Sequence, residues 1–191
     1  MGMPAQKTEW TAEMARALPD DGNRYEVLDG ELLVSPAPTW RHQKVLMRLY
    51  KLIDRYVESH SLGWTMVSPA DFEFSPRHWV QPDLFVVPDE GTGEPESSKD
   101  VKRLLMAVEV LSPSTANTDR LKKRPNYQKY GVPECWIVDF HASLVERWRP
   151  GDEQSEIIAG TLEWQPKEGI PPLRIELDEI FGPMSKEPRG Q

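Results

Sequence analysis

The stretch LLMAVEVLSPST, residues 104–115, decides the fold of this chain. Its apolar run is interrupted only by Glu109, and a continuous apolar run of this length is typical of a strand covered on both faces near the middle of a sheet. The run VQPDLFVV, residues 80–87, has the same character and contains Asp83. We therefore expect a β-sheet with these two runs near its centre.

Two longer helices and a short one are expected around these runs. The strongest pattern is at 39–61, where apolar residues recur at steps of three and four on one stripe. A second helix is expected at 118–130, kinked at Pro125, because proline lacks the N–H that a helix interior needs. A short lead-in helix is expected at 8–18, with Thr8 as its N-cap.

The remaining apolar runs predict strands. Asp29-Gly30 joins the runs 25–28 and 31–34 and is a strong signal for a two-residue hairpin. Further strands are expected at 64–67, 71–74, 135–140, 144–150, 156–160 and 161–165, with a closing strand and turn at 173–181. The chain is thus expected to form a single α/β domain over 1–191, with loose ends at about 1–7 and 183–191.

Composition limits the classes of partner. The 191 residues include 23 Lys and Arg against 31 Asp and Glu, a net charge of −8, which is opposite in sign to a strong non-specific nucleic-acid binder. Any contact with nucleic acid would therefore use a local patch or a metal-bridged phosphate. A single cysteine, Cys135, excludes an internal disulfide and a cysteine zinc site. Together with the lack of about 18 continuous apolar residues, this favours a cytoplasmic protein without a membrane partner.

Asp83 and Glu109 are acidic residues inside otherwise apolar strands. A buried carboxylate costs several kcal/mol unless it is paired, hydrogen-bonded or bound to a cation. Two of them on neighbouring strands favour a shared metal ion, and a site made of oxygen ligands suits Mg²⁺ or Mn²⁺. The alternative is that each carboxylate caps a strand end and meets solvent or a structural arginine.

The second expected helix carries a candidate lysine. Asp119, Lys123 and Tyr127 follow at steps of four and share one face of the helix, whereas Lys122 lies on a neighbouring face. Because the helix starts shortly after the strand of Glu109, its first turns can bring a lysine over the end of that strand. The alternative is a solvated basic turn.

The long helix carries a basic stripe beside its apolar one, made of Arg41, Lys44, Arg48, Lys51 and Arg55. The stripe is either a solvated face or a track for backbone phosphates. His42 lies on the apolar stripe and is either an inward-facing histidine hydrogen-bonded at the helix start or a residue that orients Glu26 or a phosphate.

Six of the seven tryptophans are scattered between residues 40 and 164 and are expected to pack in the core or at sheet edges rather than to stack on bases. They are Trp40, Trp64, Trp79, Trp136, Trp148 and Trp164.

Several segments together resemble a known family. They are RYEVLDGELLVSPAP (24–38), His42, QPDLFVV (81–87), AVEVLSPST (107–115), TDRLKK (118–123) and GVPECWIVD (131–139). In this order they resemble the Uma-two family, which is grouped with restriction endonucleases in the PD-(D/E)XK nuclease superfamily. The resemblance extends over about 8–181. It implies a restriction-endonuclease-like core, a mixed β-sheet flanked by helices, with an N-terminal helix and hairpin, extra C-terminal strands, and Mg²⁺ (or Mn²⁺) at the site.

The resemblance also assigns metal ligands. Asp83 resembles the aspartate of the family's PD motif and Glu109 its second carboxylate, both of them ligands. The main-chain carbonyl of Val110 would be a further ligand.

The other catalytic positions follow in the same way. The superfamily's lysine normally lies two residues after the glutamate, where this chain has Leu111. The family resembled has its lysine on the following helix instead, and Lys123 matches that position. Glu26 resembles the family's acidic residue in the first hairpin, and His42 its histidine at the start of the long helix. Pro125 departs from the helix-forming residue usual at its position.

The sequence therefore predicts a Mg²⁺-dependent endonuclease that hydrolyses phosphodiester bonds in DNA, with Asp83, Glu109, Lys123, Glu26 and His42 at its site. Arg41, Lys44, Arg48 and Lys51 are the candidate contacts to nucleic acid, and a homodimer is the expected assembly. Two alternatives stay open at this point. One is a non-catalytic nucleic-acid-binding or dimeric interaction protein on the same fold, and the other is a metal phosphohydrolase of small phosphate esters.

Overall fold

A six-stranded mixed sheet forms the centre of the molecule. The computed structural model describes residues 9–182, so the expected loose ends, 1–7 and 183–191, and the proposed cap Thr8 lie outside the described residues. The strand order is β10-β9-β8-β7-β6-β3, in which only the β7–β8 pair is parallel. The strands are β3 (Gly63–Val67), β6 (Leu84–Pro88), β7 (Met106–Val110), β8 (Cys135–Asp139), β9 (Leu144–Trp148) and β10 (Glu156–Ile158).

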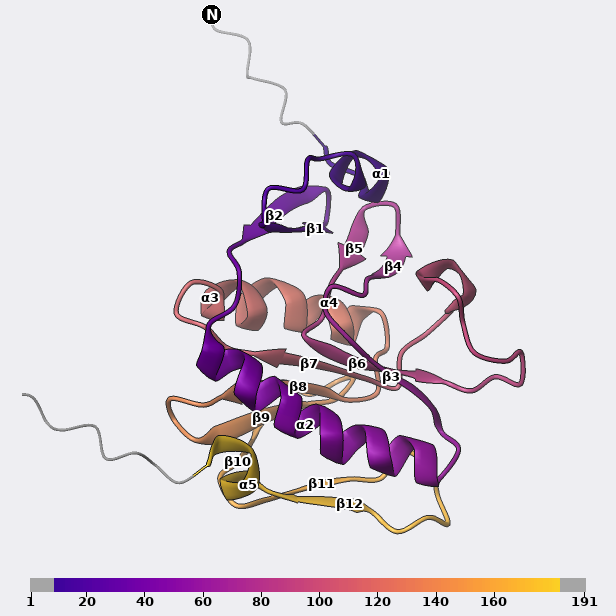
Figure 1. The fold of residues 1–191 in the computed structure, drawn as a ribbon, viewed down its shortest axis with the longest axis vertical. Coiled ribbons are helices and arrows are strands. Elements are labelled where there is room, and N and C mark those ends of the chain that lie inside the picture. The colour runs from indigo at the N-terminus through magenta and orange to yellow at the C-terminus, as the bar shows by residue number, and fades with distance from the viewer. Residues whose placement is uncertain (1–8, 183–191) are drawn as a thin grey trace, which may run out of the picture.

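The two apolar runs are neighbours at the middle of this sheet, as predicted. Every residue of β6 and of β7 is buried, and Leu84 lies opposite Val108 in the antiparallel pair. Helices cover both faces of the sheet, which is why both faces of these strands are apolar (Figure 1).

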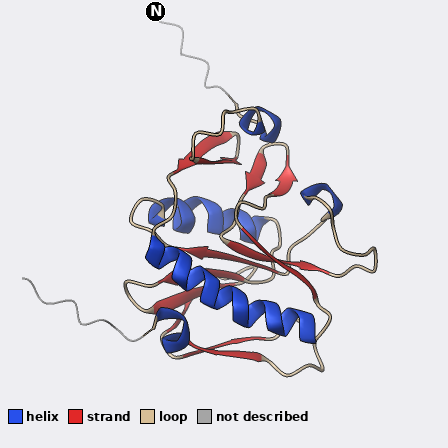
Figure 2. Cartoon of the chain, in the orientation of Figure 1, coloured by secondary structure: helices blue, strands red, loops and turns tan. Residues whose placement is uncertain are grey.

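The long helix α2 (Trp40–Ser59) covers one face, and its side chains Val45, Leu49 and Ile53 join the same core cluster as Leu84 and Val108. The opposite face is covered by a helical segment of three parts, which are α3 (Ala116–Thr118), the π-helical turn η2 (Asp119–Lys123) and α4 (Arg124–Lys129). Figure 2 shows the sheet between these two layers. The prediction of a mixed sheet flanked by helices is confirmed.

A smaller, four-stranded antiparallel sheet of order β2-β1-β5-β4 lies at the N-terminal end of the molecule. Its strands are β1 (Arg24–Leu28), β2 (Glu31–Ser35), β4 (Phe72–Ser75) and β5 (His78–Val80). The predicted hairpin is confirmed, and both turn residues have the positive φ that such turns require, 49° at Asp29 and 77° at Gly30.

Two predictions near the N-terminal sheet are wrong in detail. The run 80–87 is not one strand, because the chain leaves β5 for β6 and so passes from one sheet to the other. Pro82 in this break has no N–H to donate to a neighbouring strand. The N–H of Gln81 donates to the side-chain carboxylate of Glu26 rather than to a main-chain carbonyl. The lead-in helix is α1 (Ala12–Arg16), and its N-cap is Thr11, whose hydroxyl accepts the N–H of Met14.

The second helix also differs from its prediction. It begins at Ala116, and the irregularity expected at Pro125 takes the form of the π-helical turn just before it. Arg124 N–H donates to the carbonyl of Asp119, five residues back, which places Pro125 in the first turn of α4, where no N–H is required.

The C-terminal part is a two-stranded ribbon of β11 (Thr161–Trp164) and β12 (Leu173–Glu176), followed by α5 (Leu177–Phe181). A helix thus replaces the expected closing turn, with Asp178 and Glu179 in its first turn, where acidic residues are favourable. Within 9–182, the helices are too short or too polar for any of them to span a membrane.

Candidate functional site

Asp83 and Glu109 come together because of the pairing between β6 and β7. Leu84 opposes Val108, and the next residues beyond this pair are Asp83, which directly precedes β6, and Glu109 on β7. Residues directly opposed on antiparallel strands point to the same face of a sheet. The two carboxylates therefore leave the sheet on one side, at the point where the ladder between β6 and β7 ends.

The carboxylate of Asp83 is held by three groups. Its Oδ2 accepts the N–H of Val110 at 2.8 Å and lies 3.1 Å from Nε2 of His42, and its Oδ1 accepts a guanidinium N–H of Arg24 at 2.8 Å. Burial acts to raise the pKa of Asp83, but the hydrogen bond from His42 and the charge of Arg24 outweigh it and hold the pKa well below its usual range. Asp83 is therefore an ionised carboxylate despite its burial.

Glu109 is held by a lysine and a tyrosine from the helical segment on this face. Lys123 Nζ lies 3.1 Å from both carboxylate oxygens of Glu109, and the hydroxyl of Tyr127 donates to Oε1. Lys123 Nζ also lies 2.8 Å from Oε1 of Glu26 and 3.8 Å from Oδ1 of Asp119. One buried ammonium group is thus shared by three carboxylates.

Lys122 lies differently from its neighbour. Its Nζ is paired with Glu31 at 2.7 Å, and its side chain is 42% exposed, whereas the side chain of Lys123 is 1% exposed. The π-helical turn keeps Asp119 and Lys123 on the inward face. Of the two adjacent lysines, only Lys123 reaches the buried carboxylates.

We call the group formed by these side chains the acidic cluster. It contains four carboxylates and two cations, which are Glu26, Asp83, Glu109, Asp119, Arg24 and Lys123. Within the described residues, Oε2 of Glu26 and Oδ1 of Asp119 are buried and receive no hydrogen bond. By formal count, the cluster therefore has two more carboxyl groups than cations.

Burial is the main influence on the pKa of Glu109. It raises this pKa to about 8 against the lowering effect of Lys123, and the charges of Asp119 and Asp83 contribute to the rise. Burial likewise raises the pKa of Asp119. A cation added near these groups would relieve both the burial cost and the mutual repulsion.

The donor chemistry of the acidic cluster fits a hard divalent cation. Mg²⁺ prefers oxygen ligands, is held by one or two carboxylates and keeps several waters. Asp83, Glu109 and the carbonyl of Val110 supply only oxygens. In the stretch 9–182, no three or more His, Cys, Asp or Glu side chains are arranged around one point to hold an ion.

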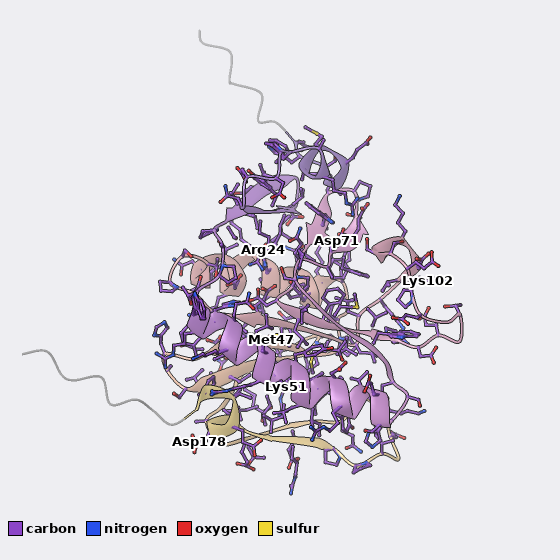
Figure 3. All side chains as sticks on the ribbon, viewed as in Figure 1. Arg24, Met47, Lys51, Asp71, Lys102 and Asp178 are labelled. Carbon is purple, nitrogen blue, oxygen red and sulfur yellow. The ribbon has the colours of Figure 1, made fainter. Side chains whose placement is uncertain are left out.

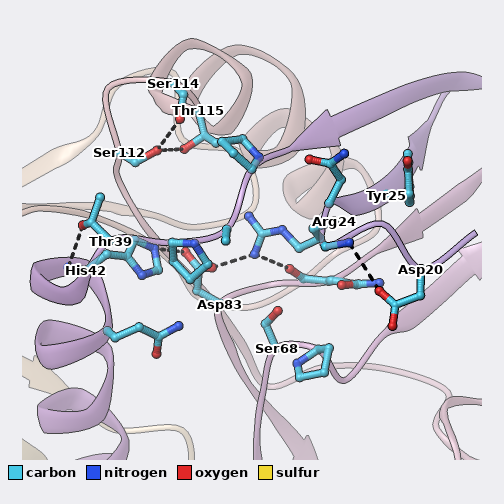
Figure 4. A pocket seen from close by; sticks show the side chains of 18 of the residues that line it. Asp20, Arg24, Tyr25, Thr39, His42, Ser68, Asp83, Ser112, Ser114 and Thr115 are labelled. Atoms are coloured by element: carbon cyan, nitrogen blue, oxygen red, sulfur yellow. Dashed lines mark hydrogen bonds and ion pairs between the residues drawn. The ribbon is translucent and has the colours of Figure 1, made fainter.

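A cavity of about 760 Å³ connects the acidic cluster with the surface. Asp83, Arg24 and His42 line it, together with the loop 112–115. Figure 4 shows Asp83 in the cavity wall between Arg24 and His42, with Ser112, Ser114 and Thr115 beyond them. Glu26, Glu109 and Lys123 are not part of the lining. Of the four carboxylates in the cluster, Asp83 is therefore the one that faces the cavity.

His42 faces inward, as one of its two interpretations required, but its partner is Asp83 and not Glu26. The backbone N–H of His42 donates to the hydroxyl of Thr39, which caps the helix at this point. The other ring nitrogen, Nδ1, is buried and lacks a hydrogen-bond partner within residues 9–182. The helix start thus positions His42 against the carboxylate that faces the cavity.

The four candidate nucleic-acid contacts in the basic stripe differ in whether the protein itself uses them. Arg41 donates to the carbonyl of Phe140 at 3.3 Å, and Arg48 donates to the carbonyl of Ile180 at 3.0 Å. Lys44 and Lys51 are exposed and form no hydrogen bond or ion pair with any described residue. Two of the four candidate contacts are therefore used within the protein, and two are available to a partner.

Arg24 was not identified from the sequence, and Asp119 and Tyr127 were identified only as face-sharing neighbours of Lys123. A signal for Arg24 is its position two residues before Glu26 on the same strand, which puts both side chains on one face. The hydrogen bond from Arg24 to Asp83 joins residues 59 positions apart, and no local sequence pattern predicts it.

Comparisons with known proteins identify the family and the fold. The sequence profile of the Uma2 family, which is the Uma-two family named above and is described as "Putative restriction endonuclease", matches residues 12–178. A crystal structure of a protein from Anabaena variabilis, described as "a putative nuclease", superposes with a TM-score of 0.73 at 18% sequence identity, covering 90% of this chain and 97% of the other. No curated protein is similar enough to count as a match.

The structural similarity shows that the two chains share a fold, and the profile extends over nearly all the residues described above. The chain belongs to the Uma2 family.

Proposed function

We propose that this protein is a Mg²⁺-dependent endonuclease that hydrolyses phosphodiester bonds in DNA. The observation that carries the proposal is the acidic cluster, in which four buried carboxylates face two cations and one carboxylate, Asp83, lies in the wall of a cavity. A cluster with more buried carboxyl groups than cations is costly to a fold, and such clusters are often functional sites.

The residues fall into two roles. Asp83, Glu109 and the carbonyl of Val110 would hold the metal ion. When bound, a divalent ion stabilises the charge that develops on phosphate oxygens and lowers the pKa of a coordinated water. His42 and Arg24 hold the carboxylate of Asp83 in place at 3.1 and 2.8 Å.

Lys123 would act on the reacting groups as a point charge. Glu26 and Glu109 keep its ammonium group charged, because both carboxylates raise the pKa of Lys123 against the opposing effect of burial. A charged lysine beside the metal ligands can orient the attacking water or stabilise a phosphate oxygen. Tyr127 supports this arrangement by donating to Glu109.

DNA would be held outside the cavity by the exposed lysines of α2. Lys44 and Lys51 have no partner among the described residues, so their charges are available to backbone phosphates. Arg41 and Arg48 contribute only if they give up their carbonyl contacts. The expected homodimer stays a prediction.

The test is a titration of Mg²⁺ and of Mn²⁺ into protein mixed with supercoiled plasmid, with nicking followed on a gel. We expect metal-dependent nicking by the natural chain and none by the Asp83→Asn variant. Hydrolysis of a small phosphate ester without nicking would instead indicate a phosphohydrolase of small esters. DNA binding without hydrolysis of either substrate would indicate a binding protein on the same fold.

A further inference from the structure

Trp40 is the most exposed large apolar side chain among the described residues, at 87% of its possible surface. This contradicts the expectation that it packs in the core or at a sheet edge. The six other tryptophans of the chain are buried or half-buried. Trp40 is the first residue of α2, so its backbone is fixed by the helix while its ring lies in solvent.

A surface groove of about 520 Å³ runs from Trp40 along α2. Its lining includes the apolar side chains of Pro38, Trp40 and Met47, and the cations Lys44, Arg48 and Lys51. Met47 and Lys51 lie along the same outward side of the helix in Figure 3. The groove thus combines an exposed aromatic ring with two cations that have no partner among the described residues.

The groove is adjacent to the cavity of the acidic cluster. Pro38 and Gln43 line both, and they lie on either side of Trp40 in sequence at the start of α2. A polymer whose phosphate reached Asp83 through the cavity would therefore have its next units near Trp40. This adjacency favours nucleic acid over a protein or a membrane as the occupant of the groove.

We propose that the groove holds an unpaired nucleotide segment of the substrate, with one base stacked on Trp40 and flanking phosphates paired with Lys44 and Lys51. The proposal rests on the endonuclease function proposed above and names its preferred substrate as nucleic acid with a single-stranded stretch. Bases in a duplex are stacked on one another and cannot offer a face to an exposed ring, whereas an unpaired base can.

Direct binding tests this proposal without any cleavage. The natural chain and its variants are titrated, in EDTA, against fluorescein-labelled oligothymidylate, a blunt DNA duplex of equal length and oligouridylate, with anisotropy as the readout. We expect the natural chain to bind oligothymidylate more tightly than the duplex. Trp40→Ala should weaken that binding by at least about fivefold, the lower end of the range for one stacked base, and Trp40→Phe should recover much of it.

Two matched controls remove an exposed side chain of similar kind elsewhere. Ile157→Ala removes an apolar side chain that is 57% exposed on β10, and Lys102→Ala removes an exposed lysine on a loop away from α2 (Figure 3). Both should bind like the natural chain. Lys44→Ala combined with Lys51→Ala should weaken binding and reduce its dependence on salt concentration.

The outcomes separate this proposal from the function on which it rests, because plasmid nicking by the natural chain is measured in parallel. Equal binding by the Trp40→Ala variant, or a preference for the duplex, overturns the proposal while nicking still supports the endonuclease. Tighter binding of oligouridylate keeps Trp40 as the stacking residue but assigns RNA as the unpaired strand. Loss of self-association in the Trp40→Ala variant, with unchanged binding of oligothymidylate, assigns the groove to a second copy of the chain and also overturns the proposal.

Discussion

The acidic cluster around Glu109 and a second group of charges around Arg147 are both associated with the strands of the central sheet. We call the second group the arginine cluster, and it consists of Glu134, Arg147, Arg149 and Glu156. Its two carboxylates face two guanidinium groups, so its formal charges balance. Arg147 donates to Glu156 at 2.5 and 2.9 Å and to the carbonyl of Glu163 at 2.7 Å.

The two clusters also differ in their access to water. In the arginine cluster, the side chains of Arg149 and Glu156 are about half exposed, at 48% and 51%. In the acidic cluster, the side chains of Glu26, Glu109 and Lys123 are at most 1% exposed. Charges that are balanced and partly hydrated stabilise a fold at little cost, whereas charges that are unbalanced and dry are costly. This difference supports the proposal that the acidic cluster binds a cation, whereas the arginine cluster needs none to balance its charges.

The largest expected effect is on metal-dependent cleavage. Asp83→Asn removes the ionised carboxylate in the cavity wall, and we expect it to reduce cleavage by more than about 100-fold, beyond the range for residues one step removed from a metal. The same change should weaken Mn²⁺ binding measured by calorimetry. Glu134→Gln in the arginine cluster is the matched control and should leave both quantities unchanged. Equal losses in the two variants would mean that the clusters do not differ in function.

The next largest effect is on stability. Lys123→Ala leaves Glu26, Glu109 and Asp119 without their shared cation, and we expect the free energy of unfolding in urea to fall by about 3–5 kcal/mol. Added Mg²⁺ should restore part of that loss, because it supplies the missing positive charge. Lys122→Ala, whose partner Glu31 is at the surface, should change stability by less than about 1 kcal/mol.

The activities of the two lysine variants sharpen the same prediction. Lys123→Ala should abolish metal-dependent nicking yet still bind metal, since the lysine is not a ligand, and Lys122→Ala should do little. The double variant Lys123→Ala/Glu109→Gln, which also removes one carboxylate, should be more stable than Lys123→Ala alone. Loss of nicking in Lys122→Ala but not in Lys123→Ala would contradict the assignment of the inward face.

A smaller effect is expected in the arginine cluster. Arg147→Ala removes charged hydrogen bonds to Glu156, but Arg149 remains beside Glu134 and water can reach the site. We expect a loss of about 1–3 kcal/mol in the free energy of unfolding. Mg²⁺ should stabilise this variant as much as it stabilises the natural chain. Rescue by Mg²⁺ beyond that level would show that the arginine cluster also binds a cation.

The last effect, and the smallest for a change of one pH unit, is a dependence of stability on pH. Burial raises the pKa of Glu109 from its ordinary value of 4.5 to about 8. Between these values the folded protein retains a proton that the unfolded chain has lost. The free energy of unfolding of the metal-free protein should therefore fall as pH rises from about 5 to about 8, by at most about 1.4 kcal/mol per pH unit. Glu109→Gln should flatten this slope, and an unchanged slope would exclude Glu109 as its source.

Local patterns in the sequence were sufficient for most of the fold. The Asp29-Gly30 hairpin, the long helix and the two central strands follow from turn chemistry and from the spacing of apolar residues, which involve only near neighbours. The same reasoning identified Asp83 and Glu109, because a charge inside an apolar run is visible without any knowledge of the fold.

Only the tertiary structure decided how the charges pair. That Arg24 and His42 hold Asp83, and that Lys123 is shared by three carboxylates, depends on contacts between residues distant in sequence. The exposure of Trp40 is likewise invisible in the sequence, where an aromatic residue at a helix start is expected to pack. Local spacing specifies which face a side chain occupies, but the partner on that face is chosen by the packing of the whole chain.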